Sequence, residues 1–165
     1  MVTYRLGKPN PKQLLFFKAR AKYIAYGGAR GGGKSWAQRG KATLLACRYN
    51  GIRILILRRT YPELTETFVK PLKKDLADVM RAGMAQYRET DKEFVFGNGS
   101  LVMLGYCDNA ADLNRYQGAE YDVIFIDEAT QWPEEWFITL TACVRGVNGF
   151  PKRIYLTCNP GGVGH

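Results

Sequence analysis

Short apolar runs alternate along this chain with longer stretches in which apolar residues recur every three or four positions. Strands buried on both faces of a sheet are predicted where the runs are nearly continuous, at residues 22–26, 52–57, 121–126 and 153–157. Helices are predicted at residues 36–49, 63–80 and 134–144. Strands that alternate with helices indicate an α/β fold, with a mostly parallel central sheet, helices on both faces and right-handed crossovers.

One further pair of apolar runs predicts a β-hairpin added to this sheet. Residues 93–96 and 101–104 flank the sequence Gly-Asn-Gly-Ser at 97–100. Asn-Gly supplies the positive φ angles that tight hairpin turns require.

Two helical stretches carry more specific expectations. Residues 11–20 predict a short amphipathic helix whose apolar side consists of Leu14, Leu15 and Phe17. In the helix over 63–80 we expect Pro71 to cause a kink or a division, because proline has no N–H and its ring clashes with the preceding turn.

The composition is that of one soluble domain. The chain has 165 residues, of which 46% are hydrophobic and 24% charged, and no apolar run is long enough to span a bilayer. We therefore expect a single domain over residues 1–165, in the cytosol and not in a membrane. Residues 159–165 have the composition of a loop leaving a strand, so we expect a fragment of a longer protein.

The cysteines and the histidine exclude two kinds of site. The cysteines form no Cys-x-x-Cys pair, so they predict buried or half-buried small residues rather than disulfides or a zinc site: Cys47, Cys107, Cys143 and Cys158. The single histidine, His165, is the last residue, which argues against a histidine base within the chain.

The charge balance favours a polyanionic partner. There are 24 Lys and Arg against 15 Asp and Glu, a net charge of +9. A solvated basic surface is the alternative. The sequence has no helix-turn-helix, zinc finger or RNP motif, so we expect contacts to a nucleic-acid backbone rather than to bases.

A phosphate-binding loop is the clearest chemical signal. The pattern G-x-x-x-x-G-K-[ST] is matched at every fixed position by Gly28, Ala29, Arg30, Gly31, Gly32, Gly33, Lys34 and Ser35. Glycines let backbone N–H groups turn toward phosphates, the lysine reaches the β/γ oxygens, and the serine hydroxyl ligates Mg²⁺. A strand precedes the loop and a helix follows it, which favours ATP or another nucleotide over a glycine-rich structural turn.

An acidic pair supplies the second element that phosphoryl transfer needs. Asp127 follows the apolar run at 123–126 and is therefore expected at a strand tip, where it would hold Mg²⁺. Glu128 is expected to polarise the attacking water. The alternative for this pair is a solvated helix cap.

Three further polar residues are candidates for nucleotide contacts. Thr157 and Asn159, at the end of the last strand, would bond the γ-phosphate or the attacking water, although Asn-Pro also favours ordinary turns. The Gln13 amide would bond adenine; a surface glutamine is the simpler alternative.

Several arginines have more than one candidate role. Arg30 would contact a phosphate or a neighbouring subunit, and Arg58 and Arg59 would bind DNA phosphates or merely extend to solvent. Arg115 and Arg145 are candidates for an arginine finger in an adjacent subunit.

Taken in order, six segments resemble the ATPase part of tailed-phage terminase large subunits: residues 13–17, 27–35, 57–64, 116–122, 127–132 and 157–162. The resemblance covers nearly the whole chain. It implies a RecA-like P-loop ATPase of the ASCE class that packages double-stranded DNA into a procapsid, in the cytoplasm of an infected bacterium. The implied assembly is a ring, usually a pentamer, at the portal protein, with a small terminase subunit as a further partner.

The resemblance also implies roles for single residues. Lys34 and Ser35 match Walker A, Asp127 and Glu128 match Walker B, and residues 157–159 match the coupling motif, while Gln13 matches the adenine-binding Q motif. The family's RNase H-like nuclease would lie beyond His165, so we expect no nuclease activity from this chain. As a fragment, the chain could be a monomer in solution. Many members have an arginine where Gln117 stands, which leaves the trans-acting finger open between Arg115 and Arg145.

Two other functions remain open at this stage. A helicase-like or other DNA-remodelling ATPase would share these motifs, although a full helicase carries a second motor domain. A non-catalytic nucleotide-binding module is disfavoured by the intact Lys34, Ser35, Asp127 and Glu128.

Overall fold

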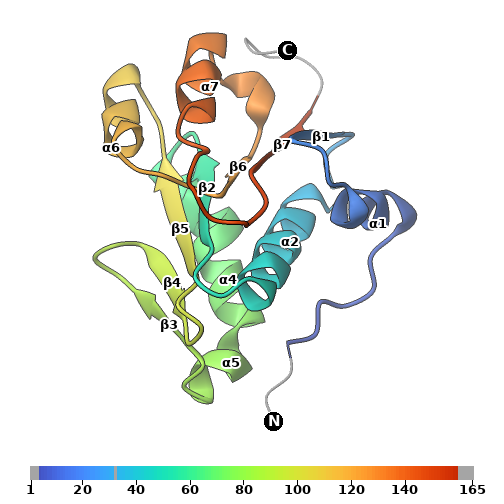
Figure 1. Cartoon of the computed structure of the whole chain (residues 1–165). Helices are drawn as coiled ribbons and strands as arrows, with labels where there is room; N and C mark the ends of the chain where they lie inside the picture. The colour runs from blue at the N-terminus through green and yellow to red at the C-terminus, as the bar shows by residue number, and fades with distance from the viewer. Residues whose placement is uncertain (1–3, 32, 160–165) are drawn as a thin grey trace.

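A seven-stranded, mostly parallel sheet forms the centre of the computed structural model, which describes residues 4–31 and 33–159 (Figure 1). In spatial order the strands are β1 (Tyr23–Gly27), β7 (Arg153–Cys158), β6 (Val123–Ile126), β2 (Arg53–Arg58), β5 (Leu101–Tyr106), β4 (Glu93–Phe96) and β3 (Ala85–Arg88). The first five run parallel, whereas β4 and β3 are antiparallel to their neighbours. The α/β fold expected from the sequence is confirmed.

Helices cover both faces of the sheet. One face is covered by α1 (Pro11–Lys18), α2 (Lys34–Arg48), α3 (Tyr61–Leu64), the π-helical turn η1 (Thr65–Val69), α4 (Lys70–Asp75) and α5 (Ala77–Arg81). The other face is covered by the 3₁₀ turns η2 (Ala110–Leu113) and η3 (Ala129–Gln131), with α6 (Asn114–Gln117) and α7 (Glu134–Thr141). No helix among the described residues is long and apolar enough to cross a membrane.

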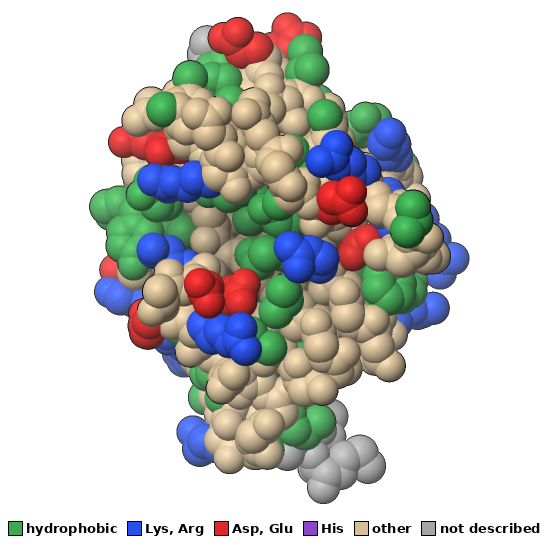
Figure 2. All heavy atoms as spheres, turned by 60° about the vertical axis from the view of Figure 1, so that its left-hand side comes forward, with side chains coloured by type: hydrophobic (Ala, Val, Ile, Leu, Met, Phe, Trp, Pro, Cys, Tyr) green, Lys and Arg blue, Asp and Glu red, His purple; other side chains and the backbone are tan. Residues whose placement is uncertain are grey.

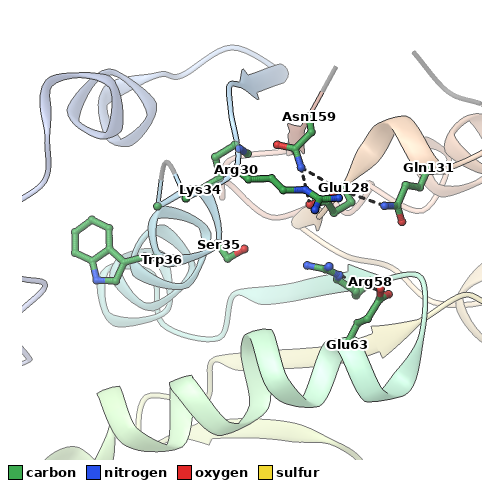
Figure 3. Close-up of a pocket in the computed structure, with 11 residues that line it drawn as sticks. Arg30, Lys34, Ser35, Trp36, Arg58, Glu63, Glu128, Gln131 and Asn159 are labelled. Atoms are coloured by element: carbon green, nitrogen blue, oxygen red, sulfur yellow. Dashed lines mark hydrogen bonds and ion pairs between the residues drawn. The ribbon is translucent and has the colours of Figure 1, made fainter. Parts of the chain in front are cut away.

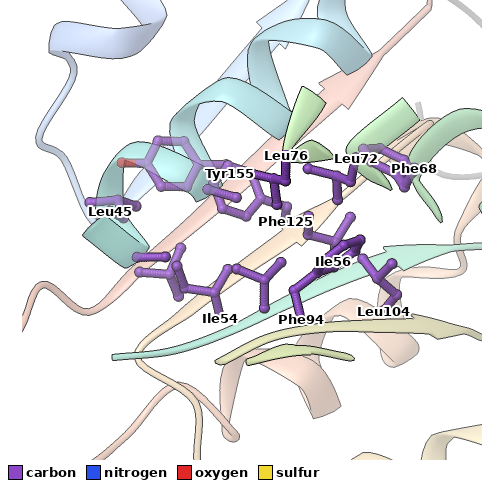
Figure 4. Close-up of a cluster of buried hydrophobic side chains, with 14 of the residues drawn as sticks. Leu45, Ile54, Ile56, Phe68, Leu72, Leu76, Phe94, Leu104, Phe125 and Tyr155 are labelled. Carbon is purple, nitrogen blue, oxygen red and sulfur yellow. The ribbon is translucent and has the colours of Figure 1, made fainter. Parts of the chain in front are cut away.

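The apolar run in β2 has a direct explanation in these layers. Ile54 and Ile56 face the larger core, while Leu55 and Leu57 face the smaller one, so consecutive residues are all buried. On the larger-core side, the rings of Phe125 and Tyr155 stack at 4.6 Å between centroids (Figure 4). Because helices cover both faces of the sheet, its central strands have apolar residues on both sides.

The predicted hairpin is present and belongs to the main sheet. β4 and β5 pair antiparallel, and β5 also pairs in parallel with β2. The pairing of β3 with β4 extends the sheet by one strand that sequence reasoning missed. Of its four residues only Ala85 is buried, so the segment carries little apolar signal.

The buried side of α1 differs from the prediction. Leu14 and Leu15 are 41% and 71% exposed, whereas Gln13 and Phe16 are buried. The Phe16 ring packs against Tyr155 at 5.2 Å between centroids, and this aromatic contact sets the rotation of the helix. The predicted apolar side was therefore wrong for the two leucines.

The helical segment after β2 is divided, as predicted, by a π-helical stretch directly before Pro71, and a second break follows at Leu76. The segment begins at Tyr61, and Pro71 lies in the first turn of α4. Pro71 has no N–H, so it cannot donate to the carbonyl four residues earlier, that of Thr67, as a normal α-helix would require. A π-turn precedes Pro71, and Arg39 Nη1 donates to the Thr67 carbonyl at 3.0 Å. The freed acceptor is thus satisfied by α2.

The cysteines follow the prediction at three of four positions. Cys107 and Cys143 are buried and Cys158 is partly buried, but Cys47 is exposed. Cys47 lies on α2 on a side that the sheet does not cover, so the prediction of burial was wrong there.

Candidate functional site

The predicted site residues follow the carboxyl ends of neighbouring parallel strands. The phosphate-binding loop follows β1, Asp127 follows β6, and Asn159 follows β7, which lies between those two strands. Pairing of Gly27 with Cys158, and of Leu57 with Ile126, brings these ends to one edge. Ligands bind at this edge in open α/β sheets.

The phosphate-binding loop uses glycine where the backbone requires it. Gly31 and Gly33 have φ of 78° and 71°, in the left-handed region. A Cβ on Gly33 would also clash with the side-chain amide of Gln13. The loop ends at Lys34, where the 15-residue helix α2 begins and directs its free N–H groups at the loop. Gly32 lies outside the described residues.

The lysine of the loop is folded onto the loop itself. Lys34 Nζ donates to the carbonyl oxygens of Gly28 and Ala29, each at 2.8 Å. These two contacts hold the ammonium at the mouth of the loop, so phosphate oxygens would replace carbonyl oxygens without a large movement.

A cavity of about 370 Å³ brings together seven of the predicted site residues (Figure 3). It is lined by Arg30, Gly31, Gly33, Lys34, Ser35, Trp36, Arg58, Glu63, Glu128, Gln131 and Asn159. Trp36, Glu63 and Gln131 were not recognised from the sequence as site residues. For Gln131 the available signal was its position three residues after Glu128.

Asp127 is buried and compensated by two side chains. Thr157 Oγ1 donates to its Oδ1 at 2.5 Å, and Arg58 Nη1 forms an ion pair with its Oδ2. The indole N–H of Trp132 donates to its backbone carbonyl at 3.2 Å. The sequence suggested that Thr157 would contact the nucleotide; in this structure its hydroxyl holds Asp127.

Glu128 is held in an unusual backbone conformation. Its φ of 53° and ψ of 51° are left-handed, which costs a non-glycine residue roughly 1 kcal/mol. Its carboxylate accepts from Asn159 Nδ2 at 3.1 Å and from Gln131 Nε2 at 3.3 Å. Two amides and the turn therefore fix the direction in which this carboxylate faces the cavity. In Figure 3 the Arg30 side chain extends from the loop toward it.

Gln13 connects α1 to the phosphate-binding loop. Its Oε1 accepts from the backbone N–H of Asn10 at 2.8 Å, and its Nε2 donates to the Gly33 carbonyl at 3.2 Å. Both ends of the amide are thus engaged within the protein. Its contact with adenine stays a prediction.

The remaining arginines lie outside this cavity. Arg115 pairs with Asp112 at 3.2 Å, and its guanidinium lies 4.6 Å from the centre of the Tyr106 ring. Arg145 pairs with Glu120 at 3.6 Å, near the amino end of β6 and so at the opposite edge of the sheet. The choice of a trans-acting finger between them stays a prediction.

Arg59 has a structural role, because its guanidinium bonds to backbone carbonyls. Its guanidinium donates to the carbonyl oxygens of Cys107 at 3.0 Å and Asp108 at 3.2 Å, and also to that of Gln131. It thereby ties the end of β2 to two loops, which leaves few donors for DNA phosphates.

The donor set at this edge suits Mg²⁺. The Ser35 hydroxyl and the Asp127 carboxylate are hard oxygen ligands, the kind that Mg²⁺ prefers. Within residues 4–31 and 33–159, no three His, Cys, Asp or Glu side chains gather as a metal site. Mg²⁺ usually keeps several waters and is bound through one or two carboxylates together with substrate phosphates.

Comparison with solved structures supports the fold. The ATPase domain of the Thermus phage P74-26 large terminase superposes with a TM-score of 0.73 at 20% identity, covering 93% of this chain and 66% of that one. The large terminase of a thermophilic bacteriophage gives 0.71 at 20% identity, covering 93% and 40%. The HK97 large terminase gives 0.71 at 14% identity, covering 92% and 33%.

This chain spans about 40% of the length of the thermophilic phage protein. That protein has also been solved with ADP and with ATP-γ-S. Among curated protein sequences no match was found. The sequence family described as phage terminase large subunit matches residues 20–165, which include all the residues that line the cavity but not Gln13. The chain therefore belongs to the phage terminase large subunit family.

Proposed function

We propose that this chain is a Mg²⁺-dependent ATPase whose hydrolysis of ATP drives double-stranded viral DNA into a procapsid. The observation that carries the proposal is the convergence of a phosphate-binding loop and an oriented carboxylate on one cavity. Lys34 and Ser35 reach that cavity from α2, and Glu128 reaches it from the end of β6. The family match and the ADP and ATP-γ-S complexes of a related large terminase support ATP as the nucleotide.

Phosphate binding would be carried out by the loop and the start of α2. Backbone N–H groups of residues 28–33 and the dipole of α2 favour the negatively charged phosphates. Lys34 would exchange the Gly28 and Ala29 carbonyls for phosphate oxygens, and Arg30 would add a second positive charge from the loop. Gln13 would contact the adenine ring.

Glu128 would act as the general base. Its carboxylate is oriented by Asn159 and Gln131 and faces the cavity, so it can accept a proton from a water positioned beside the γ-phosphate. Asn159, bonded to Glu128 and lining the same cavity, would report whether the γ-phosphate is present. When bound, Mg²⁺ held by Ser35 and Asp127 would neutralise charge on the β and γ oxygens.

The partners are inferred from the relatives. One structure related to this chain is the φ29 viral genome packaging motor assembly, with a TM-score of 0.56 at 20% identity. We infer a homo-oligomeric ring, in which Arg115 or Arg145 approaches a neighbouring nucleotide, docked on a portal protein in the cytoplasm of the infected host. The other proposed binding partners are the small terminase subunit and the backbone of double-stranded DNA.

ATP turnover in the presence of successive partners tests this proposal. We expect phosphate release to require Mg²⁺ and to increase when double-stranded DNA and procapsids are added together. Strand-separation activity on a forked duplex would instead indicate the helicase-like alternative. Turnover unaffected by DNA and procapsids would contradict a packaging function while leaving the ATPase assignment intact.

A further inference from the structure

We propose that Arg58 is a positioning residue that occupies the metal-binding carboxylate of Asp127 in the nucleotide-free protein and releases it to Mg²⁺ when the nucleotide binds. This inference rests on the proposed function, because it concerns the same nucleotide site. Arg58 thus acts through Asp127, whereas its position in the sequence suggested either a DNA contact or a solvent-exposed side chain.

The first observation is the ion pair itself. The side chains of Arg58 and Asp127 are 15% and 3% exposed, and the guanidinium pairs with Oδ2 while Thr157 occupies Oδ1. A carboxylate this buried is strongly destabilised without a positive partner. In the absence of a metal, Arg58 supplies that charge.

The second observation is the position of the guanidinium. Arg58 lines the same cavity as Lys34, Ser35 and Glu128, and Figure 3 shows it facing that cavity beside Glu63. An ion pair that served folding alone would have no need to lie at the phosphate site. Here the cation covers an oxygen that the bound metal would also require.

The third observation is an unused hydrogen-bond donor. Arg58 Nε is buried and has no hydrogen-bond partner, and it lies 3.7 Å from Glu63 Oε2, beyond hydrogen-bonding distance. The guanidinium is therefore incompletely satisfied where it stands. Glu63 already forms a long ion pair with Arg58, so it offers a second acidic partner onto which the guanidinium would shift when the metal takes Asp127.

Glu63 connects this second pairing to the helical layer. Its carboxylate accepts from Thr60 Oγ1 at 3.0 Å, and Thr60 caps the N-terminus of α3. Movement of Arg58 onto Glu63 would bring it to Oε2, the oxygen that accepts from this capping residue. Exchange of Arg58 for Mg²⁺ would thus change the side-chain contacts at the start of the helical segment 61–81.

The test measures thermal unfolding with a non-hydrolysable ATP analogue, in EDTA and in Mg²⁺, for the wild type, Arg58→Gln and Arg39→Gln. Arg39 is the matched control, because it also pairs with an acid, Asp75 at 3.3 Å, but lies outside the cavity. We expect Arg58→Gln to lower the Tm in EDTA, since Asp127 loses its partner. Its gain in Tm on adding Mg²⁺ should exceed the wild-type gain by at least about 3 °C.

The outcomes separate the two proposals. Arg39→Gln should lower the Tm with an unchanged Mg²⁺ gain, as expected for a structural pair. An Arg58→Gln gain equal to the wild-type gain would overturn the role of Arg58. Absence of any gain in the wild type would instead count against the proposed nucleotide site.

A second variant covers the case in which Arg58→Gln does not fold. Adding Asp127→Asn removes the unpaired carboxylate, so the double variant should fold and should lose its Mg²⁺ gain. A double variant that also fails to fold would show that Arg58 is needed for packing rather than for the charge of Asp127, and would overturn the proposal.

Discussion

The two adjacent acids after β6 have different surroundings and therefore different chemistry. Asp127 is buried and accepts from Thr157 and Arg58, so its charge is fixed in place and suited to hold a cation. Glu128 is partly exposed and is oriented by two neutral amides. Asp127 is therefore enclosed, whereas Glu128 lines the cavity and is placed to meet a water there.

The buried hydroxyl of Thr157 should contribute measurably to the stability of the protein. Thr157→Val preserves shape but removes the donor to Asp127 Oδ1, and we expect the free energy of unfolding to fall by about 1–3 kcal/mol. Urea denaturation checks this. Thr139→Val is the control, because its hydroxyl bonds only within α7, and its change should stay within about 0.5 kcal/mol. Equal effects of the two variants would contradict the assigned contact.

At the scale of elements, the contact of β5 with α6 depends on one glycine. A Cβ on Gly105 would clash with the phenol of Tyr116, whose hydroxyl donates to the Tyr106 carbonyl at 2.8 Å, and would also press on Leu57. The strand and the short helix approach closely because position 105 has no side chain.

Gly105→Ala should therefore destabilise the protein by about 1–3 kcal/mol, the usual cost of overpacking a core. Chemical denaturation of the variant measures it. Gly118→Ala provides the comparison, since a Cβ there meets nothing within 4 Å and its φ of −87° suits any residue. If both substitutions proved neutral, the packing of α6 on β5 would be looser than described.

Periodicity predicted most elements, and the exceptions have physical causes. Strands with two covered faces, such as β2 and β6, were recognisable because four consecutive residues in each are apolar and buried. β3 was missed because only one of its four residues, Ala85, is buried, and the contact of Tyr87 with Phe94 across to β4 leaves no local apolar pattern. In 61–81 proline predicted the irregularity at Pro71, but not its π-helical form, because the Thr67 carbonyl that it frees is satisfied by Arg39, 28 residues earlier.

At the scale of the whole molecule, the net charge of +9 is dispersed on the face shown in Figure 2, where acidic side chains lie among the basic ones. A local concentration does exist around Lys41. Burial, together with the charges of Arg153, Arg20 and Arg48, lowers the pKa of the Lys41 side chain from 10.5 to about 8. The charged ammonium therefore opposes folding at neutral pH.

This pKa predicts a pH dependence with a definite sign. Between about pH 8 and pH 10.5 the unfolded chain binds more protons at Lys41 than the folded protein, so stability from this group rises with pH. Relative to Lys41→Met, the wild type should gain about 1 kcal/mol between about pH 7 and 9.5. Urea denaturation of both proteins measures this, and the comparison removes titrations that they share. Parallel stability curves would contradict it.

The site could be predicted in part because its motifs are local in sequence. The loop at 28–35 and the pair Asp127-Glu128 are recognisable without a structure. The contact of Arg58 with Asp127 joins residues 69 apart and depends on the register of β2 against β6, which no local pattern specifies. The same holds for Glu63, which reaches the cavity only through the turn into α3.

Single-turnover hydrolysis of ATP by Glu128→Gln tests the central claim most directly, with ATP binding measured on the same protein. Glutamine keeps the shape of the side chain but cannot accept a proton, and Glu134→Gln, on the exposed start of α7, is the control. The account predicts that hydrolysis falls at least about 100-fold while the Kd for ATP changes little, and that the control behaves as wild type. Hydrolysis by Glu128→Gln within a few-fold of the wild-type rate would contradict it.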